Sequence, residues 1–293
     1  MTAQIIDGKA IAEQVIAEVG HRAQTLREKK GVVPGLAVIL VGENPASQVY
    51  VRRKAEMCER MGFLSEVHRL PATATQAEVA ERIGRLNTDP RIHGILLQMP
   101  VPDHLDGAAL QEAIRPHKDV DGFHPANAGR LALGLPGFVP CTPLGVRELL
   151  VRSGIDPSGK TAVIVGRSNI VGRPLALLLM RKERGGDATV CVCHSRTPNL
   201  GELTRLADIL VAAIGRANFI KGDMIKPGAV VIDVWINRVE DPSKKSGYRL
   251  VGDVDYEAAR AVAGAITPVP GGVGPMTIAM LMSNAVEAAT AQA

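Results

Sequence analysis

Four short apolar runs in the second half of the chain restrict its fold more than any other feature of the sequence. They cover 161–165, 189–193, 209–213 and 229–234, and they have the length and β-branched content of buried strands. A helical segment over 171–182 follows the first run. Strands that alternate with helices in this way are typical of a parallel sheet with helical crossovers. We therefore predict a Rossmann-like, doubly wound unit here.

The first half of the chain alternates in the same way. Apolar residues at near-helical spacing predict helices, and short continuous apolar runs predict buried strands. Asn followed by Pro is a good helix start, as is a capping box. The elements expected on these grounds are helices over 8–29 and from Asn44-Pro45 to about residue 61, strands over 36–41 and 92–97, and a helix opened by Thr75 and Glu78.

A segment without periodicity separates the two halves. Residues 115–140 are rich in Gly, Pro, Asn and Asp, so they are expected to form a loop, and a new helix is expected directly after them. We therefore predict an α/β protein of two domains. One comprises residues 1–141 and 271–293, and the other comprises residues 142–270. The helix after Pro275 is expected to return to the first domain.

Composition excludes several classes of protein. The 293 residues are 46% hydrophobic and 22% charged, which is typical of a globular protein with a sizeable core. A net charge of +4, with both signs interspersed, and only 3% aromatic residues argue against a nucleic-acid partner. The uncharged stretch 261–286 is too interrupted by Pro and Gly to cross a membrane. A polar turn is expected over 241–247.

The four cysteines predict no metal site. Cys58, Cys141, Cys191 and Cys193 form no CxxC pair and lie near no His at zinc-finger spacing. Reduced thiols in a cytoplasmic protein are therefore expected. The N-terminal segment also lacks the basic and apolar regions of a secretory signal.

A glycine-containing turn follows the first strand of the second half. Gly166 to Gly172 (GRSNIVG) lies between a β-branched strand and a helix, where backbone N–H groups can bind a phosphate. The spacing departs from GxGxxG, and Ser168 takes the place of the second glycine. Two interpretations stay open at this point: a nucleotide-binding turn, or a tight turn between strand and helix with no ligand.

The end of the second strand of this unit favours NADP over NAD. An NAD site usually has Asp or Glu there to bind the ribose hydroxyls, whereas this strand runs into His194-Ser195-Arg196. No acid repels a 2′-phosphate at this position. Arg167, Ser195 and Arg196 are suitable hydrogen-bond donors to such a phosphate.

A lysine without an acidic neighbour marks the helix after Asn44-Pro45. Ser47, Tyr50 and Lys54 are spaced to share one helix face. Tyr50, Val51, Met57 and Cys58 are the neighbours of Lys54 on its helix, and none of them is acidic. A lysine in such surroundings is expected to lose its proton readily, as a general base requires. The alternative is a lysine that extends its charge along the protein surface into water.

Three further segments carry polar or conformationally special residues. Gln98 follows a predicted strand, at the sheet edge where α/β proteins bind ligands. Lys118 to Gly122 (KDVDG) brings two carboxylates into one turn, and its simplest interpretation is structural. Pro268 to Pro275 (PVPGGVGP) is rigid and lacks bulk, so a flat ligand can approach it closely; the alternative is an interdomain hinge.

Taken in order, these segments resemble the bifunctional methylenetetrahydrofolate dehydrogenase/cyclohydrolase family over nearly the whole chain. The resemblance implies oxidation of 5,10-methylenetetrahydrofolate with NADP, followed by hydrolysis of the methenyl product to 10-formyltetrahydrofolate, two steps of one-carbon metabolism. It also implies a homodimer with a folate cleft between the domains. The motifs that carry it are Tyr50 to Lys54 (YVRRK), Gln98 to Pro100 (QMP), Lys118 to Gly122 (KDVDG), Pro140 to Pro143 (PCTP), Val165 to Ser168 (VGRS) and Pro268 to Pro275.

The resemblance also implies roles for individual residues. Lys54 is the expected catalytic lysine, assisted by Gln98 and Tyr50, and Asp121 anchors the pterin. The remaining expected substrate-binding residues are Ser47, Pro270, Gly271 and Gly272. The expected NADP-binding residues are Thr142, Gly166, Arg167, Ser168, Ile170, Ser195 and Ile236.

Two features depart from the family pattern. Trp235 precedes Ile236 where the family carries glycine, and the stretch 181–187 (RKERGGD) is long and charged for a connection between helix and strand. Two other functions stay open at the level of sequence. One is a dehydrogenase of this fold without cyclohydrolase activity, and the other is a nucleotide-binding module without catalysis.

Overall fold

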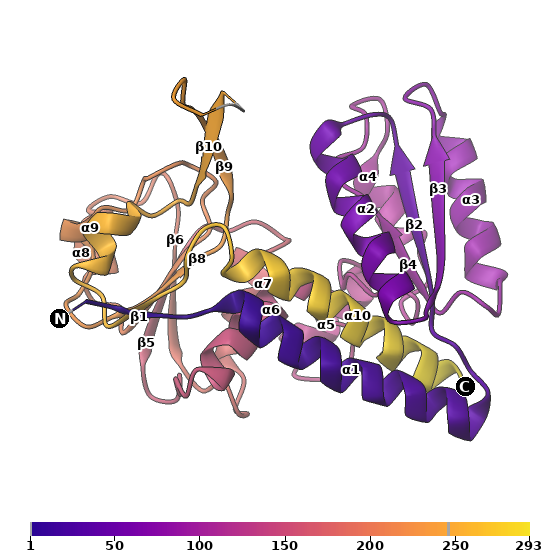
Figure 1. The fold of residues 1–293 in the computed structure, drawn as a ribbon, viewed down its shortest axis with the longest axis horizontal. Coiled ribbons are helices and arrows are strands. Elements are labelled where there is room, and N and C mark those ends of the chain that lie inside the picture. Colours follow the sequence, from indigo (N-terminus) through magenta and orange to yellow (C-terminus); the bar gives the residue numbers. More distant parts are fainter. Residues whose placement is uncertain (1, 245–246) are drawn as a thin grey trace. The chain divides into compact units, whose positions relative to one another are not determined.

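The computed structural model describes residues 2–244 and 247–293 of the chain, which form two compact units (Figure 1). Unit 1 consists of Met1–Gln14 and Thr142–Thr277, and unit 2 consists of Val15–Cys141 and Ile278–Ala293. The predicted domains also divide the chain after residue 141. The first fourteen residues differ from that prediction, because strand β1 (Gln4–Ile5) pairs with β11 (Ala265–Ile266) in the sheet of unit 1. Residues 271–277 also differ, because they belong to unit 1 and not to the first predicted domain.

Unit 1 is built on a parallel sheet of six strands. Its order is β1-β11-β8-β7-β5-β6, and every neighbouring pair is parallel. The central strands are almost completely buried, as their continuous apolar runs predict. The four predicted strands are confirmed, two of them with the predicted ends: β5 (Thr161–Val165), β6 (Thr189–Cys193), β7 (Ile209–Ala212) and β8 (Val230–Asp233).

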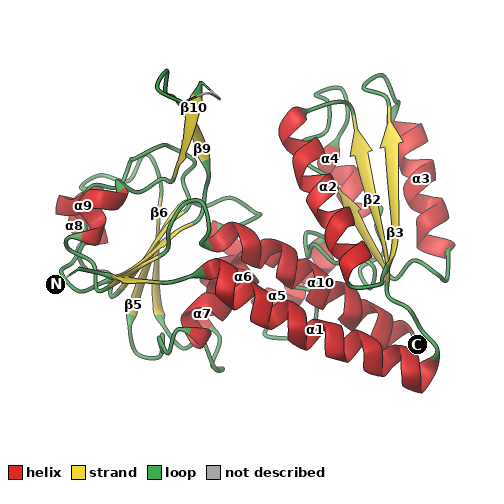
Figure 2. Cartoon of the chain, viewed as in Figure 1, coloured by secondary structure: helices red, strands yellow, loops and turns green. Residues whose placement is uncertain are grey.

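Helices and one hairpin complete unit 1 (Figure 2). The hairpin pairs β9 (Asn237–Glu240) with β10 (Tyr248–Val251) in antiparallel register. The predicted polar turn over 241–247 connects these strands, and its residues 245 and 246 lie outside the described residues. The helices are α6 (Cys141–Arg152), α7 (Gly172–Met180), α8 (Leu200–Thr204), η1 (Gly222–Met224) and α9 (Tyr256–Arg260).

Unit 2 contains a parallel sheet of three strands in the order β3-β2-β4. Helices α2 and α3 lie on either side of the strands (Figure 2). The Thr75–Glu78 capping box forms as predicted. The elements are β2 (Gly35–Val41), α2 (Pro45–Arg60), β3 (Leu64–Leu70), α3 (Gln76–Thr88), β4 (Gly94–Leu97), α4 (Gly107–Glu112) and α5 (Pro125–Ala132).

The sequence does not predict three of these elements: β3, the short helix α4, and α5. β3 is a half-buried edge strand in which polar residues interrupt the apolar ones, so it lacks the continuous apolar run of its neighbours. α5 lies inside 115–140, where only a loop is expected, and that part of the prediction is wrong. His124 caps this helix by accepting the N–H of Ala126, and Pro125 occupies its first turn.

Two long helices contain residues of both units. α1 (Gly8–Lys30) and α10 (Val273–Gln292) each begin in unit 1 and end in unit 2. Within unit 2, the amide of Asn284 donates to the carbonyl of Val120 at 2.8 Å, and that of Gln292 donates to the carbonyl of His93 at 2.9 Å. The end of α10 is thus hydrogen-bonded to the body of unit 2.

Candidate active site

Helix α2 places a lysine on its buried face. The helix begins at Pro45, and the side chain of Asn44 caps it by accepting the N–H of Ser47 at 3.0 Å. Lys54 is only 8% exposed, in the same buried stripe as Ser47, whereas Tyr50 is exposed at 41%. The alternative of a surface lysine that extends into water is therefore wrong. An amine buried this far needs a polar partner.

Gln98 is that partner. Lys54 Nζ donates to Gln98 Oε1 at 3.0 Å. The amide nitrogen of Gln98 donates to the carbonyl of Met99 at 2.9 Å, and its main-chain N–H donates to the carbonyl of Ile39 at 2.9 Å. Both the main chain and the side chain of Gln98 are thereby held at the end of β4. Its oxygen faces Lys54, at the carboxyl end of the strand where its position in the sequence places it.

An acid also acts on Lys54, but it comes from another segment of the chain. Burial raises the pKa of Asp121, and the positive charge of Lys54 opposes that rise. A hydrogen bond with the Cys141 thiol lowers the pKa of Asp121 as well. The lysine thus has no acidic residue one turn away on its own helix, as predicted, but the fold brings an acid near it from another segment.

The other two charges of the KDVDG turn have structural partners. Lys118 Nζ donates to the carbonyls of Leu86 at 3.1 Å and Asp89 at 2.8 Å, near the end of α3. The carboxylate of Asp119 accepts the main-chain N–H groups of residues 123 and 124 and the amide of residue 127. The structural interpretation of this turn therefore holds for Lys118 and Asp119. Asp121 is the acid that remains available to Lys54.

In unit 1, the turn after β5 has two positions, Gly166 and Gly172, at which the surrounding main chain leaves no space for a side chain. A Cβ on Gly166, which has a φ of 141°, would lie 2.1 Å from the carbonyl oxygen of Ala213. A Cβ on Gly172 would lie 2.0 Å from the carbonyl oxygen of Gly166. The start of α7 therefore packs directly on the turn, an arrangement that brings backbone N–H groups toward a bound phosphate. Ser168 stabilises it by accepting the N–H of Val171 at 3.2 Å.

Cationic and hydroxyl side chains surround this turn. Arg167 follows β5, and Ser195 and Arg196 follow β6, so all three lie at the carboxyl edge of the sheet, and all are exposed. Within residues 2–244 and 247–293, neither arginine side chain forms a hydrogen bond or ion pair. These donors are free to bind an anionic group.

The remaining predicted residues of unit 1 lie around other loops. The hydroxyl of Thr142 is 3.0 Å from that of Thr277. Ile170 and Ile236 are partly exposed, at 38% and 36%. Pro270, Gly271 and Gly272 directly precede α10, and the carbonyl of Gly272 packs so closely on Gly8 that a side chain there has no space.

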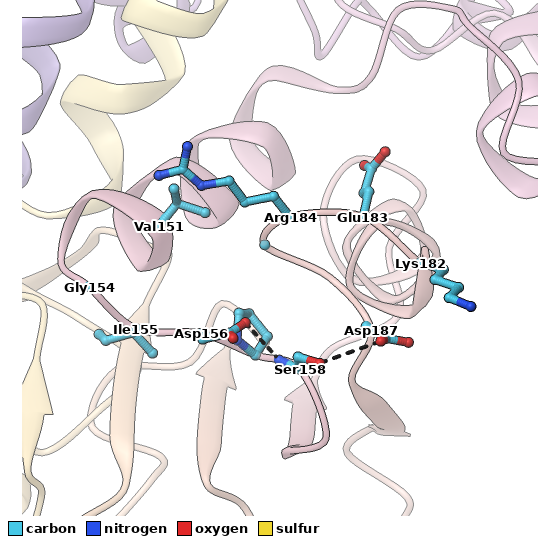
Figure 3. A pocket seen from close by; sticks show the side chains of 11 residues that line it. Val151, Gly154, Ile155, Asp156, Ser158, Lys182, Glu183, Arg184 and Asp187 are labelled. Carbon is cyan, nitrogen blue, oxygen red and sulfur yellow. Dashed lines mark hydrogen bonds between the residues drawn. The ribbon is translucent and has the colours of Figure 1, made fainter.

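A hollow of about 520 Å³ in unit 1 contains none of the predicted site residues (Figure 3). It lies between the loop before β5 and the loop before β6, at the amino ends of these strands. Parallel sheets bind ligands at the opposite edge. The charged stretch 181–187 forms part of its wall, where Glu183 accepts Arg147 Nη1 at 2.7 Å. This stretch therefore folds onto α6.

Sequence reasoning missed two buried acids of unit 1, Asp233 and Asp253. Asp233 is the last residue of β8, and Asp253 follows β10. The available signal was an acid at the end of an otherwise apolar strand. A polar residue at the end of an apolar strand predicts a functional position for Gln98, and the same pattern applies to Asp233 at the end of β8.

The fold and these side chains define a class of protein: a two-unit α/β enzyme with a dinucleotide-type turn in one unit and, in the other, a buried lysine with a partly buried amide and carboxylate. Family models agree with this assignment. Residues 6–121 match the catalytic domain of tetrahydrofolate dehydrogenase/cyclohydrolase, and residues 140–293 match its NAD(P)-binding domain. The chain belongs to the tetrahydrofolate dehydrogenase/cyclohydrolase family.

Individual relatives cover almost the whole chain. The bifunctional protein FolD of Moorella thermoacetica is 58% identical over 99% of both chains, and that of Prosthecochloris aestuarii is 57% identical over 97% of both. The crystal structure of the Campylobacter jejuni dehydrogenase/cyclohydrolase has a TM-score of 0.93 at 49% identity, covering 99% of this chain and 100% of that one. The Trypanosoma brucei enzyme, complexed with NADP and an inhibitor, has a TM-score of 0.93 at 42% identity, covering 99% and 98%.

These matches confirm the family, the fold class and the enzyme class predicted from the sequence. They favour the bifunctional enzyme over both alternatives, since the relatives are named as bifunctional proteins. Among the described residues, the structure contains no helix with the length and hydropathy of a membrane span.

Proposed function

We propose that this chain oxidises 5,10-methylenetetrahydrofolate with NADP and hydrolyses the methenyl product to 10-formyltetrahydrofolate. One observation carries the proposal: the amine of Lys54 is buried and held 3.0 Å from Gln98 Oε1, with the charge of Asp121 nearby. A buried amine with a fixed neighbour and no structural ion pair on its own helix suits proton transfer better than fold stabilisation.

The cofactor residues of unit 1 fit NADP. When bound, NADP accepts the hydride that leaves the methylene carbon. Gly166 and Gly172 leave the space next to the turn that a pyrophosphate needs, with Thr142, Ser168 and Ile170 around it. Arg167 and Ser195 bind the 2′-phosphate, supported by their exposure and by the absence of an acid after β6. Ile236 provides an apolar contact on the nicotinamide side.

The catalytic residues of unit 2 handle the proton in the hydrolytic step. Loss of hydride leaves a cation on the substrate, and the nearby Asp121 carboxylate favours that charge. Water then attacks the methenyl carbon and loses one proton, which the Lys54 amine accepts. The C–N bond of the ring breaks as the hydroxyl proton moves to the departing nitrogen. Gln98 keeps Nζ in place throughout, because its own amide is held by Met99.

The substrate contacts follow from exposure and chemistry. Asp121 accepts N–H groups from the edge of the pterin. Tyr50 is 41% exposed, so its ring offers a face on which the aromatic part of the folate stacks. Ser47 lies one turn before Tyr50 on α2, and Pro270, Gly271 and Gly272 provide a rigid surface of little bulk.

We further propose that the enzyme is a cytoplasmic homodimer. All four cysteines are free thiols, which is usual in a reducing compartment. Its proposed partners are tetrahydrofolate derivatives and NADP. The interspersed charges and the sparse aromatic residues argue against binding to nucleic acid, and no membrane partner is proposed.

Two assays on the purified protein test this function. Reduction of NADP in the presence of methylenetetrahydrofolate is followed by the absorbance of reduced nicotinamide. Hydrolysis of methenyltetrahydrofolate is followed separately without NADP. Both reactions are expected to turn over. Reduction without hydrolysis would leave a dehydrogenase only, and the absence of both would overturn the proposal.

A further inference from the structure

A fully buried carboxylate in unit 1 has no part in the mechanism described above. Asp253 has no exposed surface, and Asp233 next to it is 2% exposed. A carboxylate removed from water persists in a folded protein only where hydrogen bonds or charges replace its hydration. The partners of Asp253 therefore indicate what it does.

Asp253 accepts three hydrogen bonds from two different segments. Its Oδ2 accepts the main-chain N–H groups of Ile214 at 2.7 Å and Gly215 at 2.8 Å. Its Oδ1 accepts the side-chain amide of Asn237 at 2.9 Å. The first segment follows β7 and the second follows β8. One carboxylate thus joins the loop after β7 to the first residue of β9, the strand that follows β8 in the chain.

Both segments adjoin residues proposed to bind NADP. Ala213, directly before Ile214, packs on Gly166 so closely that a Cβ there would lie 2.1 Å from its carbonyl oxygen. The position of the loop over 213–215 therefore determines the position of the phosphate turn. Asn237 directly follows Ile236, on the proposed nicotinamide side.

Asp233 fixes the direction of Asp253. Its Oδ1 accepts the N–H of Asp253 at 2.9 Å, and its Oδ2 accepts the N–H of Val254 at 3.0 Å. With its main chain held at two consecutive residues, Asp253 has little freedom to turn away from Ile214 and Asn237.

We propose that Asp253 is a positioning residue for NADP. It acts through the loop over 213–215 and through Asn237, which it holds in the conformations that the cofactor requires. This inference rests on the proposed function, because it takes NADP as the ligand of unit 1. It also predicts which of the two activities is affected, since the catalytic residues of the hydrolytic step belong to unit 2 and this step transfers no hydride.

Three variants of the full chain test the inference. Asp253→Ala removes all three hydrogen bonds, Asp253→Asn keeps the shape without the charge, and Asn237→Ala removes one bond at a partly exposed position. The readouts are the Kd for NADP by calorimetry, the KM for NADP, and the rate of methenyltetrahydrofolate hydrolysis. If Asp253→Ala does not fold, the other two variants carry the test.

The matched control is Asp208→Ala. Asp208 also accepts a main-chain N–H, that of Thr161 at 2.9 Å, and it pairs with Lys226 at 2.6 Å. It belongs to the same sheet but lies at the amino ends of the strands. Its loss is expected to lower thermal stability and to leave the Kd for NADP unchanged.

The expected result is a rise in both Kd and KM for NADP of at least about tenfold in Asp253→Ala and about threefold in Asn237→Ala, with Asp253→Asn between them. Hydrolysis stays close to the wild-type rate. An unchanged Kd in folded Asp253→Asn and Asn237→Ala would overturn the inference, as would an equal rise in Asp208→Ala or a parallel loss of both activities. A wild-type protein that binds no NADP would instead overturn the proposed cofactor, and this inference with it.

Discussion

The Lys54 amine on α2 and the Gln98 amide after β4 are joined by a hydrogen bond of 3.0 Å. This bond links a helix to the carboxyl end of a strand, and it is formed at a site where the lysine is only 8% exposed. Because Gln98 is itself bonded to Met99 and Ile39, it holds the amine in one place. The amine and the Asp121 carboxylate together provide the proton acceptor and the negative charge that the proposed chemistry needs.

Cofactor preference is expected to depend on the residues after β5 and β6. Arg167, Ser195 and Arg196 are exposed donors, and no acid lies among them. Loss of charge-assisted bonds to the 2′-phosphate is expected to lower kcat/KM for NAD roughly a hundredfold below that for NADP. Steady-state kinetics with both cofactors checks this. Equal values would contradict the assigned phosphate contacts.

Trp235 is expected to limit the space on the nicotinamide side. It is half-buried and directly precedes Ile236, at a position where the family pattern has glycine. Trp235→Gly is therefore expected to tighten NADP binding, measured by calorimetry on a variant shown to be folded. Unchanged or weaker binding would mean that the indole only packs against its own unit.

Gly172→Ala is expected to damage the cofactor turn. The new Cβ would lie 2.0 Å from the carbonyl oxygen of Gly166, so either the main chain shifts or the unit does not fold. NADP affinity is expected to fall at least about tenfold, or the melting temperature to drop. The control is Gly20→Ala, because a Cβ on that helical residue meets nothing within 4 Å. Gly20→Ala should keep or slightly raise stability, and similar effects in both variants would contradict the close packing.

Asp233 is expected to make stability depend on pH. Burial raises its pKa from 3.8 to about 7, and the charge of Asp253 adds to the rise. The folded state therefore holds this proton more tightly than the unfolded state does. The resulting stabilisation is complete below pH 3.8 and is lost as the pH rises through about 7.

Urea unfolding of wild type and Asp233→Asn across this range measures the effect. The free energy of unfolding of the wild type should fall more steeply with rising pH than that of the variant, by no more than about 4 kcal/mol in total. Parallel profiles for the two proteins would show that Asp233 does not titrate in this window.

How far the sequence predicts this structure depends on the kind of signal. β5 and β6 are predicted with correct ends because each is a continuous run bounded by turn residues. β3 is missed because an edge strand needs apolar residues on one face only. α5 is missed because its Gly, Asn and Pro content is typical of a loop, although His124 and Pro125 provide a good helix start.

The site shows the same limit. The position of Gln98 after a strand predicts where its side chain lies, and helical spacing predicts the neighbours of Lys54 on α2. Neither pattern predicts that Asp121 would act on Lys54, because these residues belong to separate segments that only the folded chain brings together. The hydrogen bonds of Asp253 likewise join residues that are far apart in the sequence, so local residue spacing cannot predict them.

The substitution Lys54→Met tests the central claim most directly. It keeps most of the side-chain length and the helix propensity but removes the amine that Gln98 holds. Circular dichroism and the Kd for NADP should match those of the wild type. The rate of methenyltetrahydrofolate hydrolysis is expected to fall at least about a hundredfold. A folded Lys54→Met variant that hydrolyses methenyltetrahydrofolate at the wild-type rate would contradict the assignment of proton transfer to this lysine.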